Sequence, residues 1–269
     1  MMTDKEKIIE IFHNNVKGKT VCLDGLNPEH NGKKGHWLET QFGIVHNSYN
    51  EADLYGYELK NQTDTKTTFG DWSANEYIYN NPLYFSIFNE KRTIERRDHF
   101  LKIFGKPNVE KNNRYSWSGE PCPKINYYNK FGQILKIDEN NDIIVVYSYS
   151  NDMRENKNEI IPDILKQENL VLVRWYGNST PDGKRGKCLK KKVEDKFNDK
   201  GWFTCKMNED GIYTEICFGN PINYDNWIEL VKKGVVYFDS GMHELNPRPY
   251  SQWRADNNLW NSLIIEKYN

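Results

Sequence analysis

Helix-like and strand-like runs alternate along the chain, and this alternation limits the possible folds more than any other feature of the sequence. Helical periodicity is found at 4–15, 36–42, 90–104 and 224–233. Strand patterns are found at 57–60, 142–149, 170–176, 201–218 and 235–239, where 201–218 is predicted to be a hairpin that turns at 209–211. The capping-box pattern Thr3-Asp-Lys-Glu6 marks the start of the first helix. We expect a mixed α/β (α+β) fold, with strands from both sides of residue 100 in one core sheet.

The chain is long enough, at 269 residues, to bury a core without disulfide bonds. Its five cysteines are scattered and odd in number, which indicates reduced thiols rather than disulfides or a zinc site. The turn-rich stretch 177–186 indicates a boundary, so we expect two lobes, 1–170 and 171–269. The N-terminus is polar and no apolar run approaches the roughly 20 residues that span a bilayer, so a soluble protein without membrane contact is expected.

The segment Asp53-Leu-Tyr-Gly-Tyr-Glu58-Leu-Lys60 brings acidic and basic side chains close together. Successive side chains of a strand point to opposite faces, so Tyr57 and Leu59 can enter the core. Glu58 and Lys60 then emerge together on the other face. The Tyr-Gly pair favours a bend that folds Asp53 back toward Glu58. We therefore expect two carboxylates and one amine in a single small site.

This grouping has the donors that hydrolysis of a phosphodiester requires. Mg²⁺ binds one or two carboxylates and takes its remaining ligands from water and phosphate oxygens. The metal lowers the pKa of water, and Lys60 can orient the attacking water or stabilise the charge of the transition state. The alternative is a solvated strand face, on which Glu-x-Lys forms only a weak ion pair.

Several further positions resemble the PD-(D/E)xK nucleases, in the branch of the monomeric restriction endonucleases of the MvaI/BcnI type and of MutH. The segment Gly32–Ile44 looks like the glycine loop, "LE" helix and "GI" turn of that branch, and it precedes Asp53-x4-Glu58-x-Lys60. The resemblance implies that Asp53 and Glu58 bind metal, that Lys60 is the catalytic lysine, and that Glu39 is an additional acid. A solvated Glu39 is the alternative. The proline that often precedes the first Asp in this family is replaced here by alanine, which is not a ligand position.

The fold implied by the resemblance is a restriction-endonuclease-like core sheet flanked by helices, in a bilobed chain around a DNA cleft. The implied function is that of a type II restriction endonuclease, which makes Mg²⁺-dependent, site-specific cuts in double-stranded DNA and leaves 5′-phosphates, with one or two metal ions. Proteins of this kind act as monomers that nick each strand in turn, in the bacterial cytoplasm, beside a cognate DNA methyltransferase. A MutH-like mismatch-repair nickase and a DNA-binding module without catalysis are the alternatives.

Residues 239–255 combine glycine and proline with polar side chains that can read base edges. His243, Arg248 and Arg254 are the candidates for DNA contact, and the segment resembles the recognition segment of the same restriction endonucleases. The alternative is structural: the arginines bond loop carbonyls and carboxylates.

The formal net charge of −1 gives no support to a general nucleic-acid coat protein, which usually carries a large positive excess. It does not exclude a nuclease, because a nuclease needs acids for its metal and only local basic clusters for DNA. The strongest basic cluster, 184–192, makes Lys184 and Arg185 candidates for phosphate contacts. The alternative for this cluster is a solvated helix face.

Overall fold

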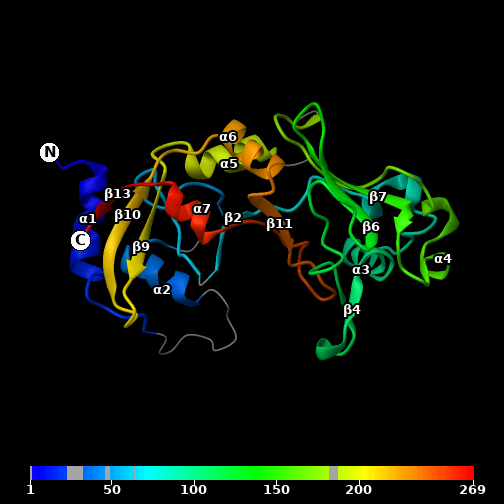
Figure 1. Cartoon of the computed structure of the whole chain (residues 1–269), viewed down its shortest axis with the longest axis horizontal. Helices are drawn as coiled ribbons and strands as arrows, with labels where there is room; N and C mark the ends of the chain where they lie inside the picture. The colour runs from blue at the N-terminus through cyan, green and yellow to red at the C-terminus, as the bar shows by residue number, and fades with distance from the viewer. Residues whose placement is uncertain (1, 23–32, 46–48, 64, 182–186) are drawn as a thin grey trace. The chain divides into compact units, whose positions relative to one another are not determined.

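The computed structural model describes residues 2–22, 33–45, 49–63, 65–181 and 187–269 (Figure 1). The chain divides into two compact units that are interleaved along the sequence. Unit 1 comprises Met1–Thr67, Lys192–Tyr224 and Ala255–Asn269, and unit 2 comprises Thr68–Lys191 and Asp225–Arg254. This division differs from the single boundary expected near residue 170, because the chain leaves unit 1 and returns to it twice. The assignment of catalysis to one lobe and DNA recognition to the other stays a prediction.

The secondary structure is mixed, as expected for an α/β chain. The helices are α1 (Asp4–Asn15), α2 (Lys33–Gln41), α3 (Thr93–Phe104), α4 (Lys157–Ile160), α5 (Leu189–Phe197), α6 (Tyr224–Lys232) and α7 (Asn257–Ser262). The strands are β1 (Glu58–Leu59), β2 (Lys66–Asp71), β3 (Glu76–Tyr77), β4 (Lys106–Asn108), β5 (Arg114–Ser116), β6 (Phe131–Ile137), β7 (Ile143–Asp152), β8 (Leu170–Trp175), β9 (Trp202–Met207), β10 (Tyr213–Gly219), β11 (Val236–Ser240), β12 (Ser251–Asp256) and β13 (Ile264–Tyr268). None of the helices in the described ranges is long and apolar enough to cross a membrane.

Local sequence signals predict several of these elements well. The capping box is present: the Glu6 amide donates to Thr3 Oγ1 at 3.3 Å, and the Thr3 amide donates to Glu6 Oε2 at 2.6 Å. The predicted hairpin is formed by β9 and β10, and Gly211 has the left-handed φ of 75° that its turn requires. Helix α2 begins three residues earlier than predicted, at Lys33.

Unit 1 is a sheet between two layers of helices. Its strand order is β1-β9-β10-β13, with β1 parallel to β9 and the other pairs antiparallel. In Figure 1 the yellow strands β9 and β10 lie side by side, with β13 at the sheet edge and α1 nearby. One face packs against α1 and α2 in a shared core; its members include Ile8, Phe12, Leu38, Phe42, Leu59, Phe203, Ile216 and Phe218. On the other face Trp202 contacts Trp260 of α7, with 5.0 Å between ring centroids.

Helix α5 provides part of the second layer and leads into β9. Phe197, at the end of α5, contacts Trp260 at 6.3 Å between ring centroids. Parallel neighbours such as β1 and β9 require a crossover connection, and α5 is the last helix of that connection. This topology places α5 on the face opposite α1 and α2, which is the face that Glu58 and Lys60 share.

Unit 2 contains a four-stranded sheet of order β3-β8-β7-β6, in which the neighbouring strands are antiparallel. Among the described residues, most of a three-stranded sheet of order β11-β12-β2 and the β4–β5 pair complete its strands; the start of β2 and the end of β12 belong to unit 1. Its core is rich in tryptophan: Trp253 is fully buried and lies 5.4 Å from Trp227 and 5.5 Å from Trp175 between ring centroids. The high aromatic content of the sequence is therefore used largely for packing.

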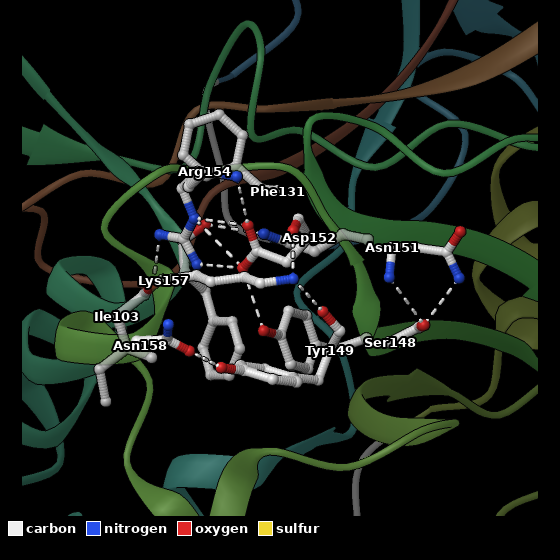
Figure 2. Close-up of polar contacts among 12 residues, drawn as sticks. Ile103, Phe131, Ser148, Tyr149, Asn151, Asp152, Arg154, Lys157 and Asn158 are labelled. Atoms are coloured by element: carbon white, nitrogen blue, oxygen red, sulfur yellow. Dashed lines mark hydrogen bonds and ion pairs between the residues drawn. The ribbon is translucent and has the colours of Figure 1, made fainter.

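A buried polar network fixes the segment that follows β7 (Figure 2). Asp152 accepts hydrogen bonds through Oδ2 from Tyr147 at 3.0 Å and from Arg154 Nη2 at 2.6 Å. Its Oδ1 accepts from Arg154 Nε at 3.0 Å, so both carboxylate oxygens are satisfied. The ammonium of Lys157 donates to the carbonyl of Asp152 at 2.8 Å. A carboxylate with every oxygen paired inside the protein is a structural ion pair.

Candidate active site

A tight turn precedes β1 and determines where the acidic residues lie. Leu54 and Tyr57 exchange backbone hydrogen bonds of 3.0 and 2.9 Å across this turn. The two residues between them have left-handed conformations, with φ of 51° at Tyr55 and 83° at Gly56. A Cβ atom on Gly56 would also collide with the carboxylate of Asp199. The bend expected from the Tyr-Gly pair is therefore present, and the left-handed conformation at position 56 favours glycine.

The turn brings Asp53 back beside the strand. The backbone amide of Leu59 donates to Asp53 Oδ2 at 2.9 Å, although the two residues are six positions apart. Asp53 is half-buried, and it is close enough to Glu58 for the charge of Glu58 to raise its pKa. The sequence prediction that Asp53 folds back toward Glu58 is confirmed by this geometry. The catalytic roles of the two acids stay predictions.

Glu58 and Lys60 lie together, as predicted, but they are buried. Lys60 Nζ is 2.8 Å from Glu58 Oε1, and the exposed fractions of the two side chains are 10% and 3%. The ammonium of Lys60 also lies 5.0 Å from the ring centroid of Phe197. The alternation of side chains predicted that Glu58 and Lys60 share one face. Helix α5 covers that face, which buries both residues.

Lys196 is a member of the site that sequence reasoning missed. Its Nζ donates to Glu58 Oε1 at 2.6 Å, from the second-last residue of α5. The two residues are 138 positions apart. The available signal was topological: a helix that connects β1 to its parallel neighbour must cover one face of the sheet, and residues of that helix then meet Glu58.

The charges of these groups perturb one another strongly. Burial raises the pKa of Asp53 to about 7, and the charge of Glu58 adds to the rise against the opposing effects of Lys196 and Lys60. Burial raises the pKa of Glu58 as well, but the combined charges and hydrogen bonds of Lys60 and Lys196 outweigh it and hold this pKa below its ordinary value. Burial and the charge of Lys196 lower the pKa of Lys60, in spite of Glu58. Such opposed shifts are typical of functional sites.

The site fits a divalent cation. Glu58 Oε2 is buried and accepts no hydrogen bond in the described part of the chain. A buried carboxylate oxygen without a partner is costly unless something else binds it. Burial raises the pKa of Asp53, and Asp53 is near enough to Glu58 for the charge of Glu58 to add to that rise, which a cation would reverse. The described ranges contain no group of three or more His, Cys, Asp or Glu residues arranged for a metal. Asp53 and Glu58 would supply two carboxylates, and Mg²⁺ usually takes one or two from a protein.

Glu39 lies on α2, the helix whose Leu38 packs in the same core as Leu59. Its side chain is half-buried, and its carbonyl accepts the Ile44 amide at 3.0 Å at the end of the helix. It does not form a three-acid metal group with Asp53 and Glu58 in the described structure. Its role as an additional acid stays a prediction.

The candidate DNA-reading residue His243 is engaged within its own loop. Its Nε2 accepts from Asn246 Nδ2 at 2.9 Å, and its Nδ1 bonds the carbonyl of Glu244. Burial lowers the pKa of His243, with smaller contributions from the charges of Arg114 and Arg97, so the ring is neutral near pH 7. These bonds favour a structural role for His243.

The two candidate arginines are also paired inside unit 2. Arg248 forms a bidentate pair with Asp71, with both distances 3.0 Å, and its guanidinium lies 4.3 Å from the ring centroid of Tyr250. Arg254 Nη1 is 3.1 Å from Asp239 Oδ2. Their contact with DNA stays a prediction. The candidates Lys184 and Arg185 lie outside the described residues.

Comparison with known proteins identifies the class. Residues 16–268 match the model of the family described as LlaMI restriction endonuclease. This match covers nearly the whole chain, and the chain therefore belongs to the LlaMI restriction endonuclease family. It is also 57% identical over 268 residues to the type II restriction enzyme ScrFI of Lactococcus lactis subsp. cremoris, a match that covers 99% of each chain.

The fold is similar to that of a solved restriction endonuclease. The structure described as the MvaI–cognate DNA substrate complex matches with a TM-score of 0.57 and 13% sequence identity, over 100% of this chain and 99% of that one. The sequence-based resemblance to restriction endonucleases is confirmed by the family match, and the similarity to MvaI is confirmed in fold.

Proposed function

We propose that this chain is a Mg²⁺-dependent type II restriction endonuclease that cuts double-stranded DNA at specific sites and leaves 5′-phosphates. The observation that carries the proposal is the pair of acids in unit 1, the buried Glu58 and the half-buried Asp53. Glu58 presents an oxygen that accepts no hydrogen bond from the described residues, and Asp53 has a pKa of about 7 beside it. Membership of the LlaMI family and the 57% identity to ScrFI support DNA as the substrate.

Asp53 and Glu58 are the residues that would hold Mg²⁺. When bound, the ion supplies Lewis acidity, which acidifies water and offsets charge on the phosphate. Lys60 holds its ammonium at the site through Glu58, at 2.8 Å, and is positioned to stabilise the negative charge that develops on the phosphate oxygens. In the reaction water attacks phosphorus and loses a proton, the bond to the 3′ oxygen breaks, and that oxygen gains a proton.

The proposal includes the assembly and the cellular setting. We propose that the chain acts as a monomer and nicks the two strands in turn, that unit 2 supplies the main DNA-reading surface, and that a cognate methyltransferase protects host DNA in the bacterial cytoplasm. The 57% identity to an enzyme named as a type II restriction enzyme favours this function over a mismatch-repair nickase. Transient accumulation of nicked plasmid, at a rate proportional to enzyme concentration, is the expected kinetic signature of a monomer that cuts sequentially.

The test of the function is direct. Purified protein is incubated with unmethylated phage DNA and Mg²⁺, and the fragment ends are sequenced. We expect discrete cut sites that vanish in EDTA and in Glu58→Ala. Glu266→Ala is the matched control, because Glu266 forms a 2.6 Å ion pair with Lys5 in the same unit but away from the site. Full activity of Glu58→Ala would overturn the site, and the absence of cuts by wild-type protein would overturn the function.

A further inference from the structure

Glu58 carries two ammonium groups on one oxygen and none on the other. Lys60 lies 2.8 Å and Lys196 2.6 Å from Oε1, while Oε2 accepts no hydrogen bond in the described part of the chain. A purely structural ion pair favours distribution of donors over both oxygens, as in the pairing of Asp152 with Arg154. With both cations on Oε1, the buried Oε2 has no hydrogen-bond donor from the described residues.

The charges at the site are balanced only without a metal ion. Two carboxylates, Asp53 and Glu58, face two ammonium groups, so the four groups sum to zero when all are ionised. A divalent cation at the carboxylates creates a surplus of two positive charges within a few ångströms, and it repels both lysines. A phosphodiester carries one negative charge, and its hydrolytic transition state carries more, so the surplus matches the substrate.

Of the two lysines, Lys196 is the one with more freedom to move. Its side chain is 17% exposed, whereas that of Lys60 is 10% exposed and lies over the ring of Phe197. Lys196 also reaches Glu58 from a helix, α5, while Lys60 directly follows β1 and is held two residues from Glu58. Repulsion by a cation therefore displaces Lys196 more readily than Lys60.

We propose that Lys196 is a second active-site cation, which serves as the counter-ion of Glu58 until a divalent cation binds and then contacts the scissile phosphate. This inference rests on the proposed function. Before the metal binds, Lys196 competes with it for Glu58. After the metal binds, Lys196 contacts the substrate phosphate. Lys196 thus couples metal binding to phosphate binding.

The first test measures metal affinity without DNA. Mn²⁺ is titrated calorimetrically into wild-type protein and into Lys196→Met. We expect the variant to bind Mn²⁺ at least about tenfold more tightly, because a positive charge close to the ion is removed. Structural damage to the site would have the opposite effect and weaken binding. Lys5→Met is the matched control, since Lys5 forms an ion pair of the same 2.6 Å length with Glu266, and its Mn²⁺ affinity should equal that of wild type.

The second test measures DNA affinity in the presence of Ca²⁺. Lys196→Met should bind a cleavage-site duplex about tenfold more weakly, with a salt-dependence slope reduced by about one. This loss should disappear on a duplex whose scissile phosphate is replaced by an uncharged methylphosphonate. Lys196→Arg should retain wild-type affinity for the natural duplex, because it keeps the charge.

The outcomes separate the inference from the function on which it rests. Unchanged Mn²⁺ affinity and an unchanged salt slope in Lys196→Met would overturn the role of Lys196. Cleavage of DNA by the wild-type protein would leave the proposed function intact. If Lys196→Met does not fold, Lys196→Gln removes the charge and retains a hydrogen-bond donor, and the same two measurements apply. Failure of wild-type protein to bind Mn²⁺ and to cut DNA would instead overturn the proposed function.

Discussion

Asp152 and Glu58 are both buried carboxylates that pair with basic side chains, but their oxygens are hydrogen-bonded differently. In unit 2, Asp152 bonds Arg154 and Tyr147, and each of its oxygens accepts at least one hydrogen bond of 3.0 Å or shorter. In unit 1, Glu58 places both of its lysines on Oε1, and Oε2 is left without a hydrogen bond from the described residues. Burial of charge is common to both clusters, so burial alone does not mark a functional site.

The difference lies in how fully the carboxylate is satisfied. A charged group that is completely hydrogen-bonded stabilises one conformation and has no capacity for a ligand. A charged group that is buried and incompletely bonded raises the free energy of the empty site, and a cation that binds there lowers it. This criterion marks the Asp152 cluster as structural. Together with the nearby acid Asp53, it supports the proposal that Glu58 binds a cation.

The largest expected effect separates the two acids by activity. Glu58→Gln should reduce the single-turnover cleavage rate by at least about 10⁴-fold, which is more than about 5 kcal/mol of transition-state stabilisation. Asp152→Asn should change the rate of the folded protein by less than about threefold, because Asp152 belongs to the structural cluster. Single-turnover cleavage at a temperature where both variants are folded provides the measurement. Equal losses in the two variants would remove the distinction between the clusters.

The second effect concerns stability. Here a substitution in the Asp152 cluster should cost more than one in the Glu58 site. Arg154→Met should lower the free energy of unfolding by about 3–5 kcal/mol, because it leaves a buried carboxylate without its cation. Lys60→Met should cost less, since Lys196 remains 2.6 Å from Glu58. Urea denaturation of the metal-free variants is the appropriate measurement. A larger loss in Lys60→Met would show that the Glu58 cluster is the more important structural element.

The third effect is a gain in stability. Asp53 has a folded pKa of about 7, above the ordinary value of 3.8, so between these two pH values the folded state holds a proton that the unfolded state releases. The free energy of unfolding of the metal-free protein therefore decreases as pH rises through this window. Asp53→Asn should be about 1–2 kcal/mol more stable than wild type at pH 8 and similar to it near pH 4. Parallel denaturation curves at the two pH values test this sign.

The smallest effect is the response of stability to the cation. Saturating Mg²⁺ should raise the melting temperature of wild-type protein by a few degrees at pH 8 and by less at pH 6, because the proton on Asp53 competes with the ion. The melting temperature of Asp53→Asn should change little with Mg²⁺ at either pH. Arg154→Met should respond as wild type does, from its lower baseline. A response of wild-type protein that does not depend on pH would contradict the competition.

The parts of the site that the sequence predicts are those determined by neighbouring residues. The turn at Tyr55-Gly56 and the shared face of Glu58 and Lys60 follow from conformational preference and strand alternation, and the capping box at Thr3 predicts α1 in the same way. Lys196 is determined by a crossover between parallel strands, and its distance of 138 residues from Glu58 hides it from any local pattern. The interleaving of the two units also depends on contacts between segments far apart in the sequence, so no local pattern predicts it.

The DNA-reading candidates show a second limit of sequence reasoning. Arg248 and His243 have the chemistry of base readers, but that chemistry also suits intramolecular bonds, and the structure pairs Arg248 with Asp71 and His243 with Asn246. Residue type in an irregular segment does not distinguish these two uses, because the same hydrogen-bond donors serve both. The pairing depends on which residues of distant segments lie nearby.

The central claim is that Asp53 and Glu58 form a divalent-cation site whereas Asp152 does not. Electron paramagnetic resonance counts the Mn²⁺ ions bound to wild-type protein, Asp53→Asn, Glu58→Gln and Asp152→Asn at pH 8. We expect wild type and Asp152→Asn to bind the same number of ions with the same affinity, and both unit 1 variants to lose that binding. Undiminished Mn²⁺ binding by Asp53→Asn and Glu58→Gln would contradict the account.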